Sequence, residues 1–264
     1  MAHQPKKRFG QHFLRDEAAL SQIIELGRLT DTDRVLEIGA GDGTLTRRLL
    51  GAGARVTAIE IDRDILPILE KLSHEREHLE IIAGDAMKID HFTLPTPMKV
   101  IANLPYQIAS GIIADLSSRP DWFPTMVVMV QREVGKRLAA DPGGKDYGTL
   151  TLWVGHRYEV KIKRIVPPES FNPPPKVDSA IILLTARKAP RVQVEDEEIY
   201  FSLIRKAFSM RRKTILNNLR SWTLQGGERL DWLNILESAE IETRRRAETL
   251  SAEDFARIAQ AIRL

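Results

Sequence analysis

The chain has 264 residues, of which 43% are hydrophobic and 28% are charged, as in an ordinary globular protein. Its formal net charge of +3 at pH 7 permits a polyanionic partner without requiring one. The absence of cysteine excludes a disulfide scaffold, a thiolate zinc site and a cysteine nucleophile. The sequence has neither an apolar run of about 18 residues, which a membrane helix needs, nor an apolar stretch behind its basic N-terminus. We therefore expect a cytoplasmic protein without a membrane span.

Strand and helix patterns alternate from Asp16 to about Thr185. Short apolar runs predict strands, and apolar residues at i, i+3 and i+4 predict helices. In chain order we predict a helix capped by Asp16, strand 34–38, helix 44–50, strand 55–61, helix 64–72, strands 79–83 and 99–102, helix 107–116, strand 125–130 and helix 133–139. This alternation predicts a mostly parallel sheet with helices on both faces.

The pattern changes after a loop at residues 141–145. Residues 158–166 and 177–185 predict two consecutive strands, which indicate an antiparallel addition at one edge of the sheet. Residues 186–198 predict a linker, and only helical patterns follow from Ile199 onward. We expect an α/β domain over residues 1–186 and a small all-helical domain over residues 187–264.

A glycine cluster follows the first predicted strand, and acidic residues end the next two. Gly39 and Gly41 let the backbone pass close to a ligand at the carboxyl edge of the sheet. Their spacing is G-x-G-x-G, whereas a dinucleotide fingerprint needs G-x-G-x-x-G, which disfavours a nicotinamide dehydrogenase. Glu60 is suited to accept hydrogen bonds from ribose hydroxyls, and Asp85 to accept from an adenine amine. Together these residues predict a nucleoside pocket without a phosphate cradle.

The fourth strand ends in Asn103-Leu-Pro-Tyr106. An aromatic amine is a poor nucleophile because its lone pair is delocalised into the ring. The Asn103 side-chain oxygen and the Leu104 carbonyl can both accept the amine hydrogens and draw that lone pair out of conjugation. Pro105 fixes the turn, and Tyr106 offers a stacking face for a base taken out of its helix. The motif therefore predicts methylation of an exocyclic amine on a nucleobase.

These motifs resemble those of the class I S-adenosylmethionine-dependent methyltransferases. The Asn-Leu-Pro-Tyr form is similar to the rRNA adenine N6-dimethyltransferases, within which the bacterial small-subunit (KsgA-type) branch is the nearest likeness. Further motifs of that family occur in its order, namely Phe9-Gly-Gln-His-Phe-Leu14, Gln131-Arg-Glu-Val134, Phe171-Asn-Pro-Pro-Pro-Lys-Val-Asp-Ser179 and Phe208-Ser-Met-Arg-Arg-Lys-Thr-Ile215. The resemblance implies a Rossmann-like sheet of about seven strands and two methyl groups placed on each of two adjacent adenosines near the 3′ end of small-subunit (16S) rRNA.

The resemblance also implies roles for individual residues. Phe171 matches an aromatic residue that the family uses against the target base. His12 stands where the family often has Asn, and Ala40 where it often has Pro. The positions that contact the methyl donor correspond to His12, Leu14, Gly39, Gly41, Glu60, Asp85 and Asn103.

A basic segment without acidic residues runs from Ile199 to Gly227. Lys206, Lys213 and Arg220 recur every seven residues, which predicts that they share one face of a helix with an apolar face opposite. We expect this basic face to contact RNA phosphates. The N-terminal Lys6, Lys7 and Arg8 are further candidates. The residues expected to bind RNA are Lys6, Lys7, Arg8, Lys206, Arg211, Arg212, Lys213 and Arg220.

The segment from His74 to His78 matches the zinc-protease string H-E-x-x-H, but it is almost wholly charged and leads directly into a predicted strand. We therefore expect no metal. Two alternative functions stay open: an RNA-docking assembly factor in which catalysis is secondary, and the large-subunit methyltransferases of macrolide resistance, which usually have Ile where Leu104 stands. The expected partner is the small-subunit rRNA or the pre-30S particle, and the expected state is a monomer.

Overall fold

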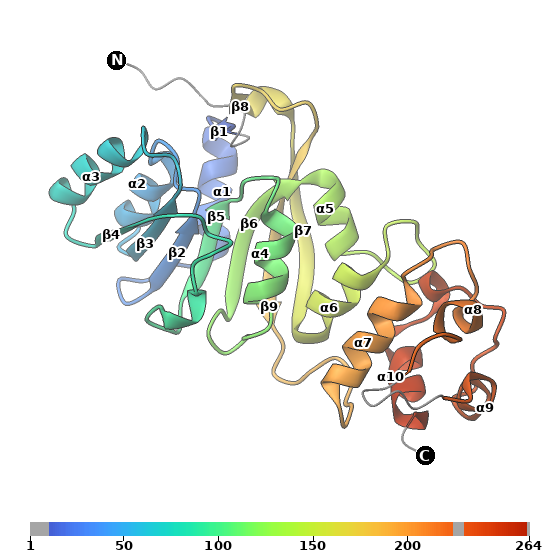
Figure 1. Cartoon of the computed structure of the whole chain (residues 1–264). Coiled ribbons are helices and arrows are strands. Elements are labelled where there is room, and N and C mark those ends of the chain that lie inside the picture. The colour runs from blue at the N-terminus through green and yellow to red at the C-terminus, as the bar shows by residue number, and fades with distance from the viewer. Residues whose placement is uncertain (1–10, 224–229, 263–264) are drawn as a thin grey trace. The chain divides into compact units, whose positions relative to one another are not determined.

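A computed structural model describes residues 11–223 and 230–262 and divides into two compact units (Figure 1). The sheet unit comprises the described residues up to Lys136 together with Tyr158–Ala186. The helical unit comprises Arg137–Arg157 and the described residues from Arg187 onward. One division between the units falls after Ala186, and residues 137–157 group with the C-terminal segment. They do so because Tyr147 and Leu152 belong to the same buried apolar cluster as Tyr200 and Leu203.

The sheet unit contains a seven-stranded sheet in the order β4-β3-β2-β5-β6-β9-β7. Its parallel strands are β2 (Arg34–Ile38), β3 (Arg55–Glu60), β4 (Leu79–Ala83), β5 (Lys99–Asn103) and β6 (Thr125–Gln131). β9 (Ser179–Ala186) runs antiparallel to both β6 and β7 (Tyr158–Val166). The predicted mostly parallel sheet with an antiparallel addition at one edge is confirmed.

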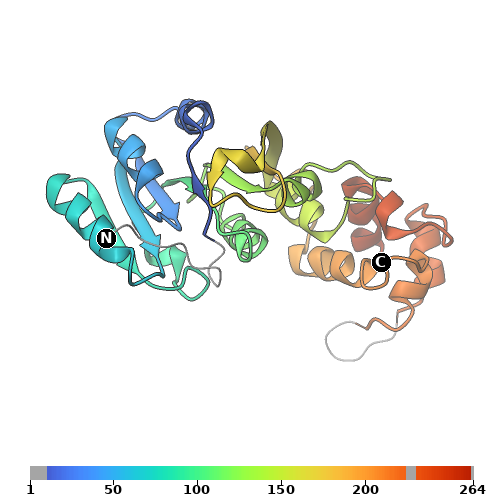
Figure 2. The ribbon, with the colours of Figure 1, turned by 90° about the horizontal axis from the view of Figure 1, so that it is seen from above.

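Helices cover both faces of this sheet. α2 (Thr44–Gly51), α3 (Leu66–Glu75) and α4 (Ala109–Leu116) connect parallel strands, whereas α1 (Glu17–Gly27) precedes β2 and α5 (Arg132–Leu138) follows β6. Figure 2 shows α1 and α4 on opposite sides of the strands. The strand order reverses between β2 and β5, and such a reversal leaves a crevice at the carboxyl ends of these strands. No helix of the described residues has the length and apolarity to cross a bilayer.

Two short strands and several helical turns have no counterpart among the sequence-based predictions. β1 (Phe13–Leu14) pairs antiparallel with β8 (Phe171–Asn172), and two residues are too few to give a periodic signal. The unpredicted α6 (Thr149–Arg157) precedes β7 directly. The short 3-10 helices are η2 (His91–Thr93), η3 (Pro168–Ser170) and η4 (Ala247–Thr249).

The described part of the helical unit is built from helices around its own core. Besides α6 it contains α7 (Glu197–Ala207), α8 (Ile215–Leu219), α9 (Trp232–Ser238) and α10 (Ala252–Ala261). Asp196 caps α7, and Ser251 caps α10 in a reciprocal capping box, which satisfies free backbone N–H groups at both helix starts. Phe255, fully buried, lies in the core.

The basic face predicted from the spacing of Lys206, Lys213 and Arg220 is wrong, because α7 ends at Ala207 and α8 begins only at Ile215. The buried Asn218 side chain holds the intervening turn. Its Nδ2 donates to the carbonyl oxygens of Ala207 (2.6 Å) and Met210 (3.1 Å). An internal polar anchor of this kind is invisible to a charge-spacing argument.

Candidate active site

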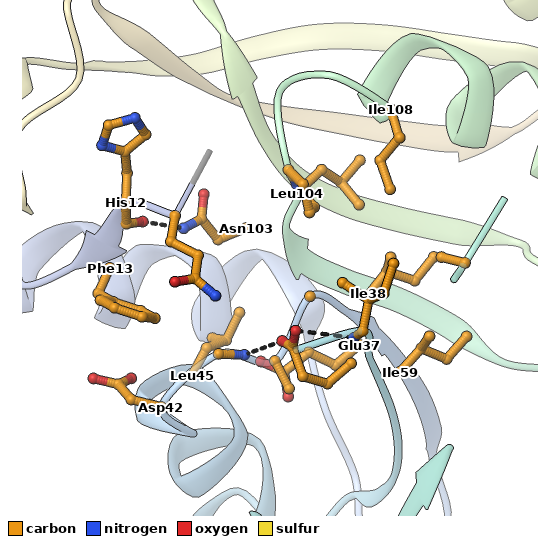
Figure 3. A pocket seen from close by; sticks show the side chains of 18 of the residues that line it. His12, Phe13, Glu37, Ile38, Asp42, Leu45, Ile59, Asn103, Leu104 and Ile108 are labelled. Atoms are coloured by element: carbon orange, nitrogen blue, oxygen red, sulfur yellow. Dashed lines mark hydrogen bonds between the residues drawn. The ribbon is translucent and has the colours of Figure 1, made fainter. Parts of the chain in front are cut away.

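A cavity lies at the carboxyl ends of β2, β3, β4 and β5, where the strand order reverses (Figure 3). It collects residues from segments that are distant in the sequence. Among its lining residues are all those expected to contact the methyl donor and three of the four expected to contact the base: His12, Leu14, Gly39, Gly41, Glu60, Asp85, Asn103, Leu104 and Tyr106.

Three glycines of the loop after β2 have positive φ, and other segments of the site approach two of them closely. Gly39 (φ +75) and Gly41 (φ +57) lie in the left-handed region, which side chains disfavour. A Cβ on Gly39 would lie 2.9 Å from Pro105 Cγ, and one on Gly41 would lie 2.8 Å from Phe13 Cε1. The glycines therefore let two other segments of the site approach the loop closely.

Glu60 organises the same loop from the end of β3. Its buried carboxylate accepts from the backbone N–H of Gly41 (2.9 Å) through Oε2. Its Oε1 accepts from the backbone N–H groups of Ile61 and Asp62 (both 2.9 Å). A carboxylate has about four acceptor positions, so acceptance of both ribose hydroxyls requires that at least one of these bonds be exchanged.

Asp85 and Leu14 complete the predicted donor side of the cavity. Asp85 Oδ1 accepts from the backbone N–H of Met87 (3.0 Å), and its side chain is 33% exposed. Lys88 Nζ lies 4.0 Å from Asp85 Oδ2. Leu14 is buried and contributes apolar surface.

Glu37, at the end of β2, is a site residue to which the sequence analysis assigns no role. It is 1% exposed and lines the cavity, and its Oε2 has no hydrogen-bond partner among the described residues. Burial, helped by the neighbouring Glu60 and Asp42 and opposed by the Thr46 hydroxyl, raises the pKa of Glu37 to about 8. The carboxyl is therefore largely protonated at neutral pH and can donate a hydrogen bond. A lone acid within the apolar strand Val35–Ile38 is the signal that could have found it.

Asn103 has a fixed orientation at the end of β5. Its Nδ2 donates to the backbone oxygen of His12 (3.0 Å), as the dashed line in Figure 3 marks. Because that donor is engaged, Oδ1 serves as the acceptor on the other side of the amide. Leu104 N donates to Met129 O (3.1 Å), and no group of the described residues donates to Leu104 O. Asn103 Oδ1 and Leu104 O, from consecutive residues, are thus both available as hydrogen-bond acceptors.

Tyr106 is partly buried, and its hydroxyl lies 2.6 Å from Ser179 Oγ. Burial raises the pKa of the Tyr106 hydroxyl, which the hydrogen bond to Ser179 partly offsets. The ring stacks against His12 with centroids 5.7 Å apart and planes inclined by 25°. The His12 ring itself is hydrogen-bonded through Nδ1 to Pro173 O (2.8 Å).

The structure does not bring Phe171 into the cavity. Its ring is 4% exposed and belongs to the hydrophobic core of the sheet unit, where β8 pairs Phe171 with Leu14. The alternating register of the β1–β8 pair directs this side chain inward. A contact with a base requires the ring to leave this position, and that role stays a prediction.

The basic residues of the helical unit that the sequence singles out are mostly exposed. Arg211, Arg212 and Lys213 occupy the turn between α7 and α8, and Arg211 donates to the backbone oxygen of Lys145. Lys206 Nζ lies 3.2 Å from Ser221 Oγ, and Arg220 is exposed just after α8. The candidates Lys6, Lys7 and Arg8 lie outside the described residues.

The zinc-protease string does not form a metal-binding helix face. α3 ends at Glu75, so His74 lies in its last turn and His78 lies beyond it. Within residues 11–223 and 230–262, no group of three or more His, Asp or Glu side chains is arranged to hold a metal ion.

The charge of the cavity lining indicates the kind of ligand that fits. The described lining residues include the acids Asp42, Glu60 and Asp85, besides the neutral Glu37 carboxyl, and neither Lys nor Arg. Such a lining suits a nucleoside that carries positive charge and no phosphate, and the unpartnered Oε2 of Glu37 offers it a further buried polar contact. S-adenosylmethionine, with its ribose, adenine, ammonium and sulfonium groups, has this chemistry. The fold and site together define a Rossmann-like class I S-adenosylmethionine-dependent methyltransferase.

Comparison with known proteins narrows this class. The family described as "Ribosomal RNA adenine dimethylase" matches residues 2–263, and the chain belongs to this family. It is 42% identical over 259 residues to ribosomal RNA small subunit methyltransferase A of Clostridium acetobutylicum, covering 97% of this chain and 93% of the relative. It is 43% identical over 265 residues to the protein of the same name from Syntrophotalea carbinolica, covering 99% and 98%.

Solved structures agree with this placement. A dimethyladenosine transferase from Plasmodium falciparum superposes with a TM-score of 0.79 and 30% identity, covering 94% of this chain and 96% of the other. The 23S rRNA methyltransferase ErmE gives a TM-score of 0.72 and 27% identity, covering 96% and 100%. Both similarities extend over nearly the whole chain, the C-terminal segment included.

Proposed function

We propose that this protein transfers methyl groups from S-adenosylmethionine to N6 of two adjacent adenosines near the 3′ end of 16S rRNA, two groups to each, during ribosome biogenesis. The observation on which the proposal depends is the orientation of Asn103. Its amide nitrogen is engaged by His12 O, which leaves the amide oxygen as an acceptor beside the Leu104 carbonyl.

The chemistry follows from these two acceptors. Asn103 Oδ1 and Leu104 O accept the amine hydrogens and turn the nitrogen lone pair out of conjugation with the ring. S-adenosylmethionine supplies a methyl group activated on a sulfonium. Tyr106 stacks on the flipped base and excludes water from one of its faces. No strong base is needed, because the amine proton becomes acidic once the nitrogen has gained the methyl group.

The choice of rRNA subunit is supported by the relatives. Those named for the small subunit are 42% and 43% identical to this chain, whereas the structure named for 23S rRNA is 27% identical. Leu104 also departs from the Ile usual in the macrolide-resistance enzymes. These comparisons favour the small subunit over the large-subunit alternative.

The helical unit is the proposed RNA-docking part. The exposed Arg211, Arg212, Lys213 and Arg220 offer charges for phosphate groups of a pre-30S particle. We place this monomeric enzyme in the cytoplasm, where that particle assembles. The alternative function, an assembly factor in which docking matters more than catalysis, predicts a different result from the catalytic proposal. Under that alternative, ribosome maturation would stay normal when Glu60→Ala abolishes donor binding.

The proposal is tested by replacing Asn103 with Ala and measuring methyl transfer to undermethylated small-subunit particles, with the products mapped by mass spectrometry. Loss of the orienting acceptor should lower transfer by about 100-fold. Asn234→Ala, at an exposed position of α9, is the matched control and should retain activity. Undiminished transfer by the Asn103 variant would refute the assigned role.

A further inference from the structure

His12 joins three segments of the site through three different contacts. Its backbone oxygen accepts from Asn103 Nδ2 (3.0 Å), its Nδ1 lies 2.8 Å from Pro173 O, and its ring stacks on Tyr106 with centroids 5.7 Å apart. The pairing of β1 with β8 brings the segments of His12 and Pro173 together. Of the three contacts, only the first is independent of the side chain.

The hydrogen bond to Pro173 shows that one particular nitrogen of the His12 ring carries a hydrogen. A carbonyl oxygen only accepts, so His12 Nδ1 carries the hydrogen. This bond, together with the stack on Tyr106, fixes the direction of the ring. Figure 3 shows the His12 ring directed away from Glu37 and Leu45, two other residues that line the cavity.

Tyr106 is correspondingly held at two points. The His12 ring lies against it at an inclination of 25°, and Ser179 Oγ lies 2.6 Å from its hydroxyl. Ser179 is 0% exposed, so this hydrogen bond is protected from competition by water. A tyrosine fixed at its ring and at its hydroxyl loses little further freedom when a base stacks on it.

We propose that His12 and Ser179 are positioning residues for Tyr106. The His12 side chain thus affects, through Tyr106, how the rRNA base is held and not how the methyl donor is bound. This inference rests on the proposed function, in which Tyr106 stacks on the target adenine. It also revises the role that the family resemblance implies for the position of His12, since the imidazole is committed to Pro173 and Tyr106.

Three substitutions separate the contacts of His12. His12→Asn keeps a donor for Pro173 and lacks the ring, His12→Phe keeps a ring and lacks the donor, and His12→Ala lacks both. We expect His12→Ala and His12→Asn to lower kcat/KM for small-subunit particles about threefold to tenfold, the range of an aromatic pair, and His12→Phe to lower it less. Donor Kd, measured by calorimetry, should stay within about twofold. His78→Ala, at an exposed position, is the control.

Double-substitution cycles then decide whether the effect passes through Tyr106. In a Tyr106→Ala background, His12→Ala should change kcat/KM less than about twofold, and Ser179→Ala and Tyr106→Phe should be equal and non-additive. Retained donor Kd shows that each variant is folded. A loss of donor affinity beyond about fivefold in His12→Ala, or multiplicative effects of His12→Ala and Tyr106→Ala, would overturn this inference alone. Unchanged methyl transfer by Tyr106→Ala would overturn both it and the base-stacking part of the proposed function.

Discussion

In two regions of this protein, the spacing of residues in the sequence predicts which of them lie together in the structure. These regions are the cavity at the carboxyl edge of the sheet and the basic segment of the helical unit. Gly39, Glu60 and Asn103 meet in one cavity, because the ends of parallel strands must lie at one edge. Lys206 and Lys213 share no helix, because α7 ends between them. Spacing therefore predicts position where sheet topology constrains the chain, and it fails where an internal turn interrupts a periodic pattern.

The strongest test of this difference is Gly39→Ala in the cavity. A Cβ at φ +75 would lie 2.9 Å from Pro105 Cγ, so the loop and the Asn-Leu-Pro-Tyr turn must move apart. A displacement of about 1 Å at a catalytic turn costs on the order of 100-fold in rate, and we expect such a loss of methyl transfer. Gly51→Ala is the control, because its Cβ would meet no atom within 4 Å. Equal activities of the two variants would contradict the close approach.

In the helical unit the corresponding test is Asn218→Ala. The change leaves the carbonyl oxygens of Ala207 and Met210 without this donor, and a lost buried hydrogen bond costs about 1–3 kcal/mol. Urea unfolding should show this loss of stability, while donor affinity in the sheet unit stays unchanged. The exposed neighbour Asn217, replaced by Ala, should change stability by less than about 0.5 kcal/mol. If both variants are equally stable, Asn218 does not hold the turn.

The basic turn itself should contribute to RNA affinity although it forms no helix face. Arg212→Gln with Lys213→Gln removes two exposed charges, and each lost phosphate contact reduces the slope of log K against log salt by about 0.7–0.9. Binding to small-subunit particles should therefore weaken and depend less on salt. The exposed pair Lys71 and Arg76 of the sheet unit gives a matched control. An unchanged slope would remove the turn from the docking surface.

What the sequence predicts and what it misses have a common physical reason. The strands from Arg34 onward are short apolar runs that the sequence displays directly, and Glu60, Asp85 and Asn103 at or just after their ends line the cavity. The contacts of His12 with Pro173 and of Tyr106 with Ser179 join segments 161 and 73 positions apart. Such contacts depend on tertiary packing, which no local pattern records. Phe171 shows the same limit, since its motif implies a role and only the register shows that its ring is buried.

Glu37 gives the test with the smallest expected effect, and only the structure reveals the buried environment of this residue. Its pKa rises from 4.5 to about 8 in the folded protein, so the native state binds more protons than the unfolded state between these values. Stability must then fall as pH rises through this window, by up to about 1.4 kcal/mol per pH unit. Glu37→Gln should remove this part of the slope in urea unfolding between pH 6 and pH 8, whereas Glu25→Gln, at an exposed position of α1, should not. A parallel pH dependence of the Glu37 variant and the unmodified protein would show that Glu37 is ionised inside the cavity, and its predicted role as a neutral hydrogen-bond donor would be lost.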